Sequence, residues 1–226
     1  MIKTVLLVLV SLLPGIFWVR YFYRQDKYEP EPSYLILLAF IGGISAIAPS
    51  LFLEHGFVQQ FLLAAELKKN FLNLFIGSLG IGIIEEGFKL LVLYLLAFRN
   101  KEFNEPVDGI IYGVSAGLGF AVVENLFYTT RFGLMVGVVR AVIGCLAHAS
   151  FSGLAGYYWA SAKFSGNTDK YALSFLGPVF WHTLYNFLLF QGTALRLFLA
   201  LAIIAGIISF LLNSIKEEVK RSPFRP

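Results

Sequence analysis

Long apolar runs separated by short polar segments dominate the 226-residue chain. A transmembrane helix needs about 20 consecutive apolar residues to cross the hydrocarbon core of a bilayer. Seven runs meet this requirement, and they predict an all-α, polytopic helix bundle that forms one domain over residues 1–226. The predicted spans are residues 4–23, 33–53, 74–98, 108–130, 135–160, 171–190 and 193–213.

Two segments next to these spans need an interpretation of their own. The first apolar run resembles a signal peptide, but no small-x-small cleavage site follows it, and the bulky Phe17 and Trp18 come next. We therefore expect a retained first span. Residues 57–71, FVQQFLLAAELKKNF, mix apolar and polar positions and predict an interfacial amphipathic helix.

Basic residues in the loops predict the orientation, because cytoplasmic loops carry an excess of Lys and Arg. With the N-terminus outside, eleven basic residues fall inside and five outside. We therefore expect a multi-pass protein of the cell membrane with a cytoplasmic C-terminus. The inner residues are Arg20, Arg24, Lys27, Arg99, Lys101, Lys163, Lys170, Lys216, Lys220, Arg221 and Arg225, and the outer ones are Lys3, Lys68, Lys69, Arg131 and Arg196.

Composition agrees with this picture and excludes other classes. Charged residues make up 14% of the chain, whereas soluble domains carry nearer a quarter. The net charge of +4 reflects loop asymmetry, and the absence of a basic run with interleaved aromatic residues argues against a nucleic-acid partner. The single cysteine, Cys145, excludes an internal disulfide and lies in an apolar stretch, as expected of a small core residue.

Small residues recur every four positions in the fourth predicted span. Gly109, Gly113, Gly117 and Ala121 form a stripe that would let another helix approach closely, and helix packing is its preferred interpretation. Asp108 stands just before this span, where it is expected to be the N-cap.

The third span contains three ionisable residues, Glu85, Glu86 and Lys89. Each charge at the centre of a membrane helix costs roughly 2.5–3.5 kcal/mol on insertion scales, so they require compensation. At about 100° per residue, Lys89 falls between the two carboxylates and can reach either. A buried structural ion pair would explain this motif alone. Gly82, on the same face, is expected to leave room for water or a substrate backbone.

Other spans carry polar residues at compatible depths. Phe120 and Glu124 share one helix face, as do His148 and Ser152, and His182 and Asn186; Arg140 and Asn125 also fall inside spans. A buried carboxylate can take a proton from water, and imidazole and amide N–H groups can stabilise an oxyanion. The set therefore indicates hydrolysis. The same donors could bind zinc through His148, His182 and Glu85, although no HExxH motif is present.

Five stretches together carry a resemblance to a known family: PGIFWVRYFYRQDKYEPEP, EEGFK, EPVDGIIYGVSAGLGFAVVEN, HASFSG and FWHTLYN. Over nearly its whole length the chain resembles the PrsW family. These are multi-pass membrane proteases of Gram-positive bacteria that make the first cut, at site 1, in an anti-sigma factor. The resemblance implies a stress-response protease with a single-span membrane protein as substrate. It also implies that Glu85 activates water, Glu86 pairs with Lys89, and His182 and Asn186 hold the oxyanion.

The PrsW family is itself similar to the CAAX prenyl proteases and bacteriocin-processing enzymes, whose pattern is EExxxR, FxxxH and HxxxN. Here Lys89 comes one position earlier than the arginine, and Glu124 follows Phe120 where the pattern has histidine. His148 is the candidate for the missing imidazole.

The sequence therefore predicts an intramembrane peptidase of glutamic type that needs no cofactor, with Glu85, Glu86, Lys89, Glu124, His148, His182 and Asn186 as its catalytic set. The spacing alone does not separate Glu85 from Glu86 as the base. A zinc-dependent protease is the alternative within the class, and a prenyl-protein or bacteriocin-type peptidase is a related one. A proton-coupled transporter or a membrane scaffold would belong to other classes, but the chain shows no inverted repeat.

Overall fold

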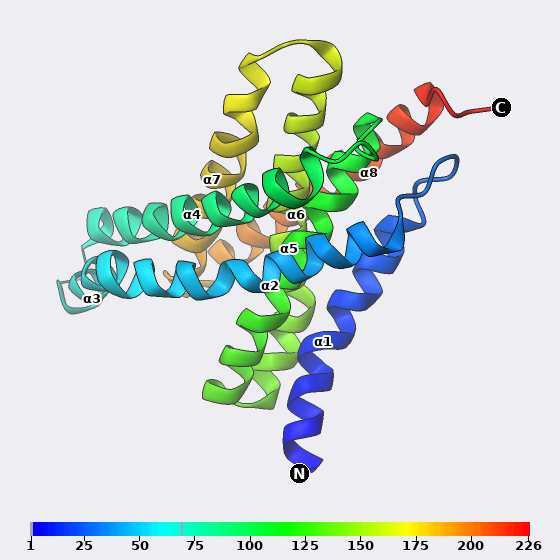
Figure 1. Ribbon diagram of the computed structural model, residues 1–226. Coiled ribbons are helices and arrows are strands. Elements are labelled where there is room, and N and C mark those ends of the chain that lie inside the picture. The colour runs from blue at the N-terminus through cyan, green and yellow to red at the C-terminus, as the bar shows by residue number, and fades with distance from the viewer. Residues whose placement is uncertain (1, 69) are drawn as a thin grey trace.

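The computed structural model of the chain describes residues 2–68 and 70–226 (Figure 1). Every regular element in these ranges is helical, which confirms the all-α class. The helices are α1 (Ile2–Tyr23), α2 (Ser33–Leu53), α3 (Gln59–Lys68), α4 (Phe71–Leu93), α5 (Pro106–Phe132), α6 (Leu134–Ser165), α7 (Asp169–Leu189) and α8 (Ala194–Arg221), with π-helical segments η1 (Glu54–Val58) and η2 (Tyr94–Phe98) continuing α2 and α4. Met1 and Lys69, the latter counted above as an outer basic residue, lie outside the described residues.

Each predicted span coincides with a helix, and the polytopic bundle is confirmed. Five helical segments are long and apolar enough to cross a membrane: Val5–Tyr23, Ser33–Leu67, Pro106–Phe132, Leu134–Ser165 and Ala194–Arg221. The other two predicted spans, 74–98 and 171–190, correspond to α4 with η2 and to α7. These two helices carry Glu85, Glu86, Lys89 and His182, and their crossing of the membrane stays a prediction.

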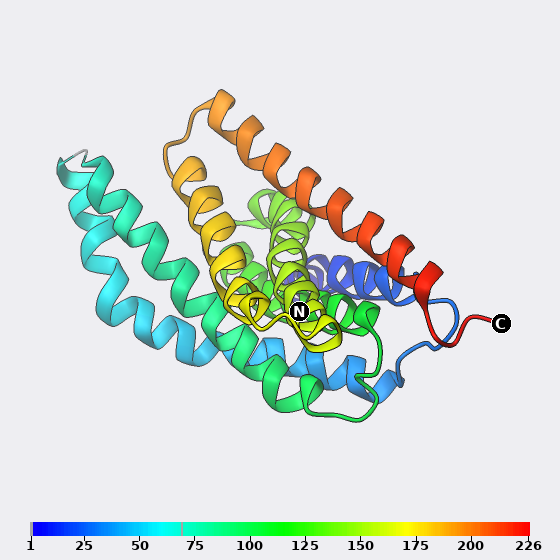
Figure 2. The same cartoon turned by 90° about the horizontal axis from the view of Figure 1, so that it is seen from above.

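The segment after the second span differs from the prediction. Instead of a separate interfacial helix, α2 continues through η1 into α3 as one long rod, and α4 returns beside it in the opposite direction (Figures 1 and 2). Between Leu53 and Gln59 the sequence has no proline to end the helix. The reversal comes at Asn70, whose side chain caps α4 by accepting the N–H groups of Leu72 at 2.9 Å and Asn73 at 3.3 Å.

Helix α5 starts earlier than expected, so the N-cap assignment of Asp108 is wrong. Pro106 occupies the first helical position, which suits its fixed φ and missing N–H, and Glu105 is the N-cap. Asp108 lies within the first turn. Its Oδ2 accepts the backbone N–H groups of Asn104 and Glu105, both at 2.8 Å.

The glycine stripe of α5 packs against α6, as predicted. A Cβ atom at Gly109, Gly113 or Gly117 would collide with the carbonyl oxygen of Gly156, Ser152 or His148, respectively. The backbones of the two helices therefore touch along three turns. On another face of α5, Gly119 lies against the backbone of Phe40, which brings α2 equally close.

These close approaches make α5 the centre of the bundle. Helices α2 and α4 cross α5 and α6 steeply on one side, and α8 crosses them on the opposite side (Figures 1 and 2). Helix α7 packs against both α4 and α6. In Figure 1 the start of α1 lies at the bottom, the end of α3 and the start of α4 lie at the left, and the α5–α6 turn lies at the lower left; all three were predicted to face outside. The α1–α2 loop and the C-terminus lie at the upper right and the α6–α7 loop lies at the top, and which of these sides faces the cytoplasm stays a prediction.

Candidate active site

The ammonium group of Lys89 is the centre of a buried polar network. Its Nζ lies 3.1 Å from Oε2 of Glu85, 2.8 Å from Oε1 of Glu86 and 2.9 Å from Nδ1 of His148. The aromatic ring of Phe120 covers the fourth side of the ammonium, with its centroid 4.0 Å from Nζ of Lys89. Since an ammonium has three N–H donors, all of its hydrogen bonds are used. The predicted pairing of Lys89 with both carboxylates is thus present.

His148 on α6 links this centre to α5. Because the ammonium can only donate, Nδ1 of His148 accepts, and Nε2 therefore carries the proton of the neutral ring. That Nε2–H donates to Oε2 of Glu124 at 2.7 Å. Nη2 of Arg140 forms an ion pair with the same carboxylate oxygen at 2.7 Å. Hydrogen bonds thus run from Lys89 on α4 through His148 to Glu124, and an ion pair extends this chain to Arg140.

His182 on α7 approaches from the other side. Its Nδ1 lies 2.8 Å from Oε1 of Glu86, so Nδ1–H donates to that carboxylate. The ring stacks on Phe151 with centroids 4.9 Å apart, which restricts its orientation. The remaining nitrogen, Nε2, points toward Glu85, with its Oε2 at 4.0 Å. This separation is too long for a direct hydrogen bond.

A small cavity of about 90 Å³ lies beside the network, and its walls include Glu85, His148, His182 and Asn186. The structure thus brings all seven predicted site residues to one place, six of them through direct contacts and Asn186 through this shared wall. The two neighbouring glutamates of α4 differ here: Glu85 lines the cavity, whereas Glu86 is turned to Lys89 and His182.

A second cavity of about 380 Å³ adjoins the first, and Glu54, Glu85, Glu124 and Tyr128 line both. Its other walls are largely apolar side chains of α2 and α5: Ile47, Leu51, Phe120 and Phe127. The carboxylate of Glu85 is therefore reached from the side of the bundle, between the end of α2 and α5.

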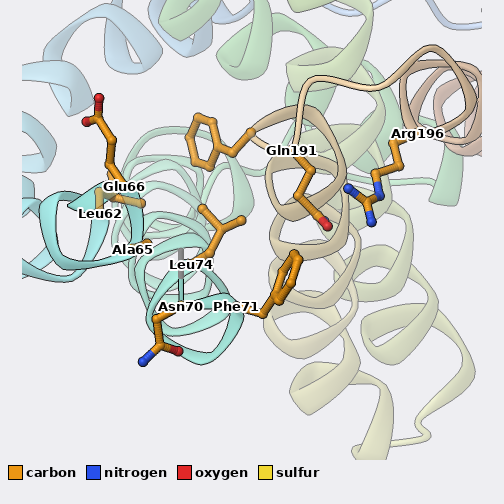
Figure 3. A pocket seen from close by; sticks show the side chains of 9 residues that line it. Leu62, Ala65, Glu66, Asn70, Phe71, Leu74, Gln191 and Arg196 are labelled. Carbon is orange, nitrogen blue, oxygen red and sulfur yellow. The ribbon is translucent and has the colours of Figure 1, made fainter. Parts of the chain in front are cut away.

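A third cavity, of about 550 Å³, lies between the α3–α4 turn and the α7–α8 turn (Figure 3). Leu62, Glu66 and Leu74 form one side, and Gln191 and Arg196 the other. Phe190 lines both this cavity and the 90 Å³ cavity, so it separates the turn region from the buried network.

Three residues near the site lay outside the predicted set. Glu54 opens η1, and its Oε1 is buried without a hydrogen-bond partner in the described part of the chain. Sequence reasoning missed it because the apolar run ends at Leu53, and the π-helical turn, a feature common at functional sites, has no sequence signal. Arg140 was noticed only as an intramembrane charge. Tyr128 stands one turn after Glu124, and this spacing was the available signal for it.

One expectation for a neighbouring residue fails. Gly82 does not leave space for water or substrate: a Cβ there would lie 2.8 Å from Oγ1 of Thr183 and 3.1 Å from the carbonyl of Val179, so Gly82 lets α7 approach α4. Ser152 shares a helix face with His148 but packs against Gly117 of α5. Its hydroxyl is buried and has no hydrogen-bond partner in the described part of the chain.

The network contains metal-binding residue types, and their fit to an ion can be tested directly. One donor atom from each of Glu85, Glu86 and His148 lies within 4.8 Å of the others. However, Lys89 Nζ contacts all three residues at 2.8–3.1 Å and occupies their centre. A cation and an ammonium cannot share this position, so a metal does not fit while Lys89 remains there.

Comparison with known protein families decides the assignment. Residues 31–212 match the family described as PrsW family intramembrane metalloprotease, and this range contains every residue of the network. The chain belongs to the PrsW family. It is thus a multi-pass membrane peptidase, and the transporter and scaffold alternatives are set aside.

Curated PrsW relatives support the same assignment. The chain is 34% identical to Protease PrsW of Geobacillus kaustophilus over 81% of its own length and 79% of the relative. It is 30% identical to Protease PrsW of Bacillus subtilis over 79% and 80%, and 32% identical to that of Clostridioides difficile over 81% and 78%. No solved structure matches the chain significantly.

Proposed function

We propose that this PrsW protein is an intramembrane endopeptidase of glutamic type that uses Glu85 as its general base. The observation that carries this proposal is that Glu85 and Glu86 have different surroundings. Oε1 of Glu86 accepts from Lys89 and His182, whereas Glu85 has one contact with Lys89 and faces both cavities. A base must reach the water whose proton it takes.

In this mechanism a water in the cavity donates a proton to Glu85 as its oxygen attacks the peptide carbonyl. The carbonyl oxygen becomes an oxyanion, and the amide group of Asn186 stabilises it. In its imidazolium form, in which both ring nitrogens carry a proton, His182 contributes a second donor from Nε2 while Nδ1–H stays on Glu86. Collapse of the intermediate breaks the C–N bond, and Glu85 returns its proton to the leaving amine.

The other residues act by positioning these groups. Lys89 holds Glu85 through one of its three hydrogen bonds. His148, fixed between Lys89 and Glu124, completes the ammonium shell, and Arg140 balances the charge of Glu124. Such an arrangement keeps the base in place without reorganisation during the reaction.

The substrate that suits this site is a single-span membrane protein, such as an anti-sigma factor, cut near the outer face. The apolar walls of the 380 Å³ cavity match a membrane segment that approaches between α2 and α5. The 550 Å³ cavity lies at turns that the basic-residue pattern assigns to the outer side, which supports cleavage at that end.

The decisive test compares two Glu-to-Gln variants in purified protein mixed with a single-span substrate. Glu85→Gln keeps the shape of the site but removes the base, so cleavage is expected to stop. Glu217→Gln is the matched control, because its side chain is exposed on α8 and pairs only with Lys220 among the described residues. Wild-type cleavage by Glu85→Gln would remove Glu85 from the reaction.

A zinc-dependent protease remains the second candidate, because the family description reads metalloprotease and the donor set contains carboxylates and imidazoles. Such an enzyme requires Lys89 to leave the centre of the three donors. Cleavage that survives exhaustive chelation supports the glutamic mechanism. Loss of cleavage with chelator, restored by zinc, would replace it and make Glu85, His148 and His182 the ligands.

A further inference from the structure

A second group of buried acidic residues lies at the opposite end of α5. Asp26 comes from the α1–α2 loop and Glu31 from the residues just before α2, while Glu105 and Asp108 lie at the start of α5. All four are at most 4% exposed. Figure 1 shows the α1–α2 loop and the start of α5 toward the upper right, on the same side as the C-terminus. Asp108 and Glu124 are separated by about 24 Å along α5, at 1.5 Å per residue, so this cluster is distinct from the active site.

The carboxylates of Asp26, Glu105 and Asp108 converge. One oxygen of each lies within 4.8 Å of the other two. Three atoms that lie within 4.8 Å of one another always leave a point no farther than about 2.8 Å from all of them, whereas Ca²⁺ binds oxygen at 2.3–2.6 Å and Mg²⁺ at 2.0–2.1 Å. Small side-chain rotations would therefore allow the three oxygens to surround a hard cation.

These oxygens also lack the hydrogen bonds expected of buried carboxylates. In the described part of the chain, no donor meets hydrogen-bond geometry with either oxygen of Asp26, Oε1 of Glu105 or Oδ1 of Asp108, although the backbone N–H groups of Tyr28 and Glu29 lie near Asp26. Oε1 of Glu31 is also buried without a hydrogen-bond partner among the described residues, although Oε2 of the same carboxylate accepts from the hydroxyl of Tyr112. Buried polar groups are nearly always satisfied, so these atoms point to a ligand.

The charge of the cluster is not balanced by side chains. Within residues 2–68 and 70–226, none of the four forms an ion pair. Lys163, whose charge acts on Asp108, donates its Nζ to the carbonyl of Phe103. The N-termini of α2 and α5 supply roughly half a positive charge each, about one unit against four carboxylates. Burial accordingly raises the pKa of Asp26 to about 6 and that of Glu31 to about 7.

We propose that Asp26, Glu105 and Asp108 bind a hard divalent cation, Mg²⁺ or Ca²⁺, that ties the α1–α2 loop to the start of α5. Glu31, whose charge acts on Asp108, adds to the attraction. The cation supplies the missing partner for the free oxygens and about two units of positive charge. Its function is to hold the first turn of α5, the helix that carries Glu124 toward its other end.

The test uses the purified full chain in detergent at pH 8, after treatment with EDTA. Adding Mg²⁺ or Ca²⁺ at about a hundred times the dissociation constant is expected to raise the melting temperature by roughly 5–10 °C. Tb³⁺ provides a second readout, because Tyr112 at Glu31 can sensitise its luminescence. The more effective competitor for Tb³⁺ identifies the preferred ion.

Asp26→Asn is the informative variant, because asparagine keeps the size of the side chain and an oxygen that can still accept from the nearby backbone N–H groups of Tyr28 and Glu29, but removes the negative charge. It is expected to abolish both the thermal shift and the luminescence, while the exposed control Glu217→Gln keeps both. If the carboxyl groups instead share protons, neither cation shifts the wild-type melting temperature, which overturns the proposal. Equal responses of Asp26→Asn and Glu217→Gln would also overturn it. Should Asp26→Asn fail to accumulate, the wild-type luminescence and its competition still decide.

Discussion

Removing the central cation of the active site is the strongest perturbation that the structure suggests. Lys89→Met keeps most of the side-chain volume but leaves Glu85 and Glu86 without their ammonium. At an effective dielectric constant of about 20, the attraction between Lys89 and Glu86 at 2.8 Å is about 6 kcal/mol before desolvation is subtracted. Breaking a buried pair by removing one partner typically costs 3–5 kcal/mol, because the other charge stays buried. That is a large part of a total stability of about 5–15 kcal/mol.

We therefore expect Lys89→Met to lower the melting temperature by roughly 6–20 °C, at about 2–4 °C per kcal/mol for a chain of this size. The double variant Lys89→Met with Glu86→Gln removes one of the stranded charges. It should recover stability relative to the single variant, with a coupling of about 0.5–3 kcal/mol between the two positions.

Thermal unfolding in detergent, followed by the intrinsic fluorescence of the three tryptophans, measures both variants beside the wild type. Glu217→Gln again serves as the control for a carboxylate change outside the site. The reasoning is refuted if Lys89→Met has the same melting temperature as the wild type. It is also refuted if the destabilisation of the double variant equals the sum of the destabilisations of its two single variants.

Two further predictions concern the oxyanion and the topology. Asn186→Ala should slow cleavage about a hundredfold to a thousandfold, the usual loss for one oxyanion donor, while a single-span substrate still co-purifies; full-rate cleavage would exclude Asn186 from the site. A reporter fused after Pro226 should be cytoplasmic and one inserted next to Lys68 should be outside; both on the same side would contradict seven spans.

The sequence alone determined the helices and the local geometry of the charged motif. Apolar runs of about 20 residues predict helices regardless of how those helices later pack, because a backbone in lipid must satisfy its hydrogen bonds within its own segment. The contacts of Lys89 with Glu85 and Glu86 follow from spacings of four and three residues on one helix. The stripe of Gly109, Gly113 and Gly117 likewise predicted a close contact with another helix, but it did not identify that helix.

Tertiary structure decided everything that depends on which helices meet. The contacts of Lys89 with His148 and of Glu86 with His182 join residues 59 and 96 positions apart, and no periodicity encodes them. The proposal of Glu85 over Glu86 as the base rests on the cavity that Glu85 lines, and the π-helical turn at the end of α2 brings Glu54 beside it. Asp108 shows the same limit: its place at a helix start was visible in the sequence, but its convergence with Asp26 required the loop and the helix to fold together.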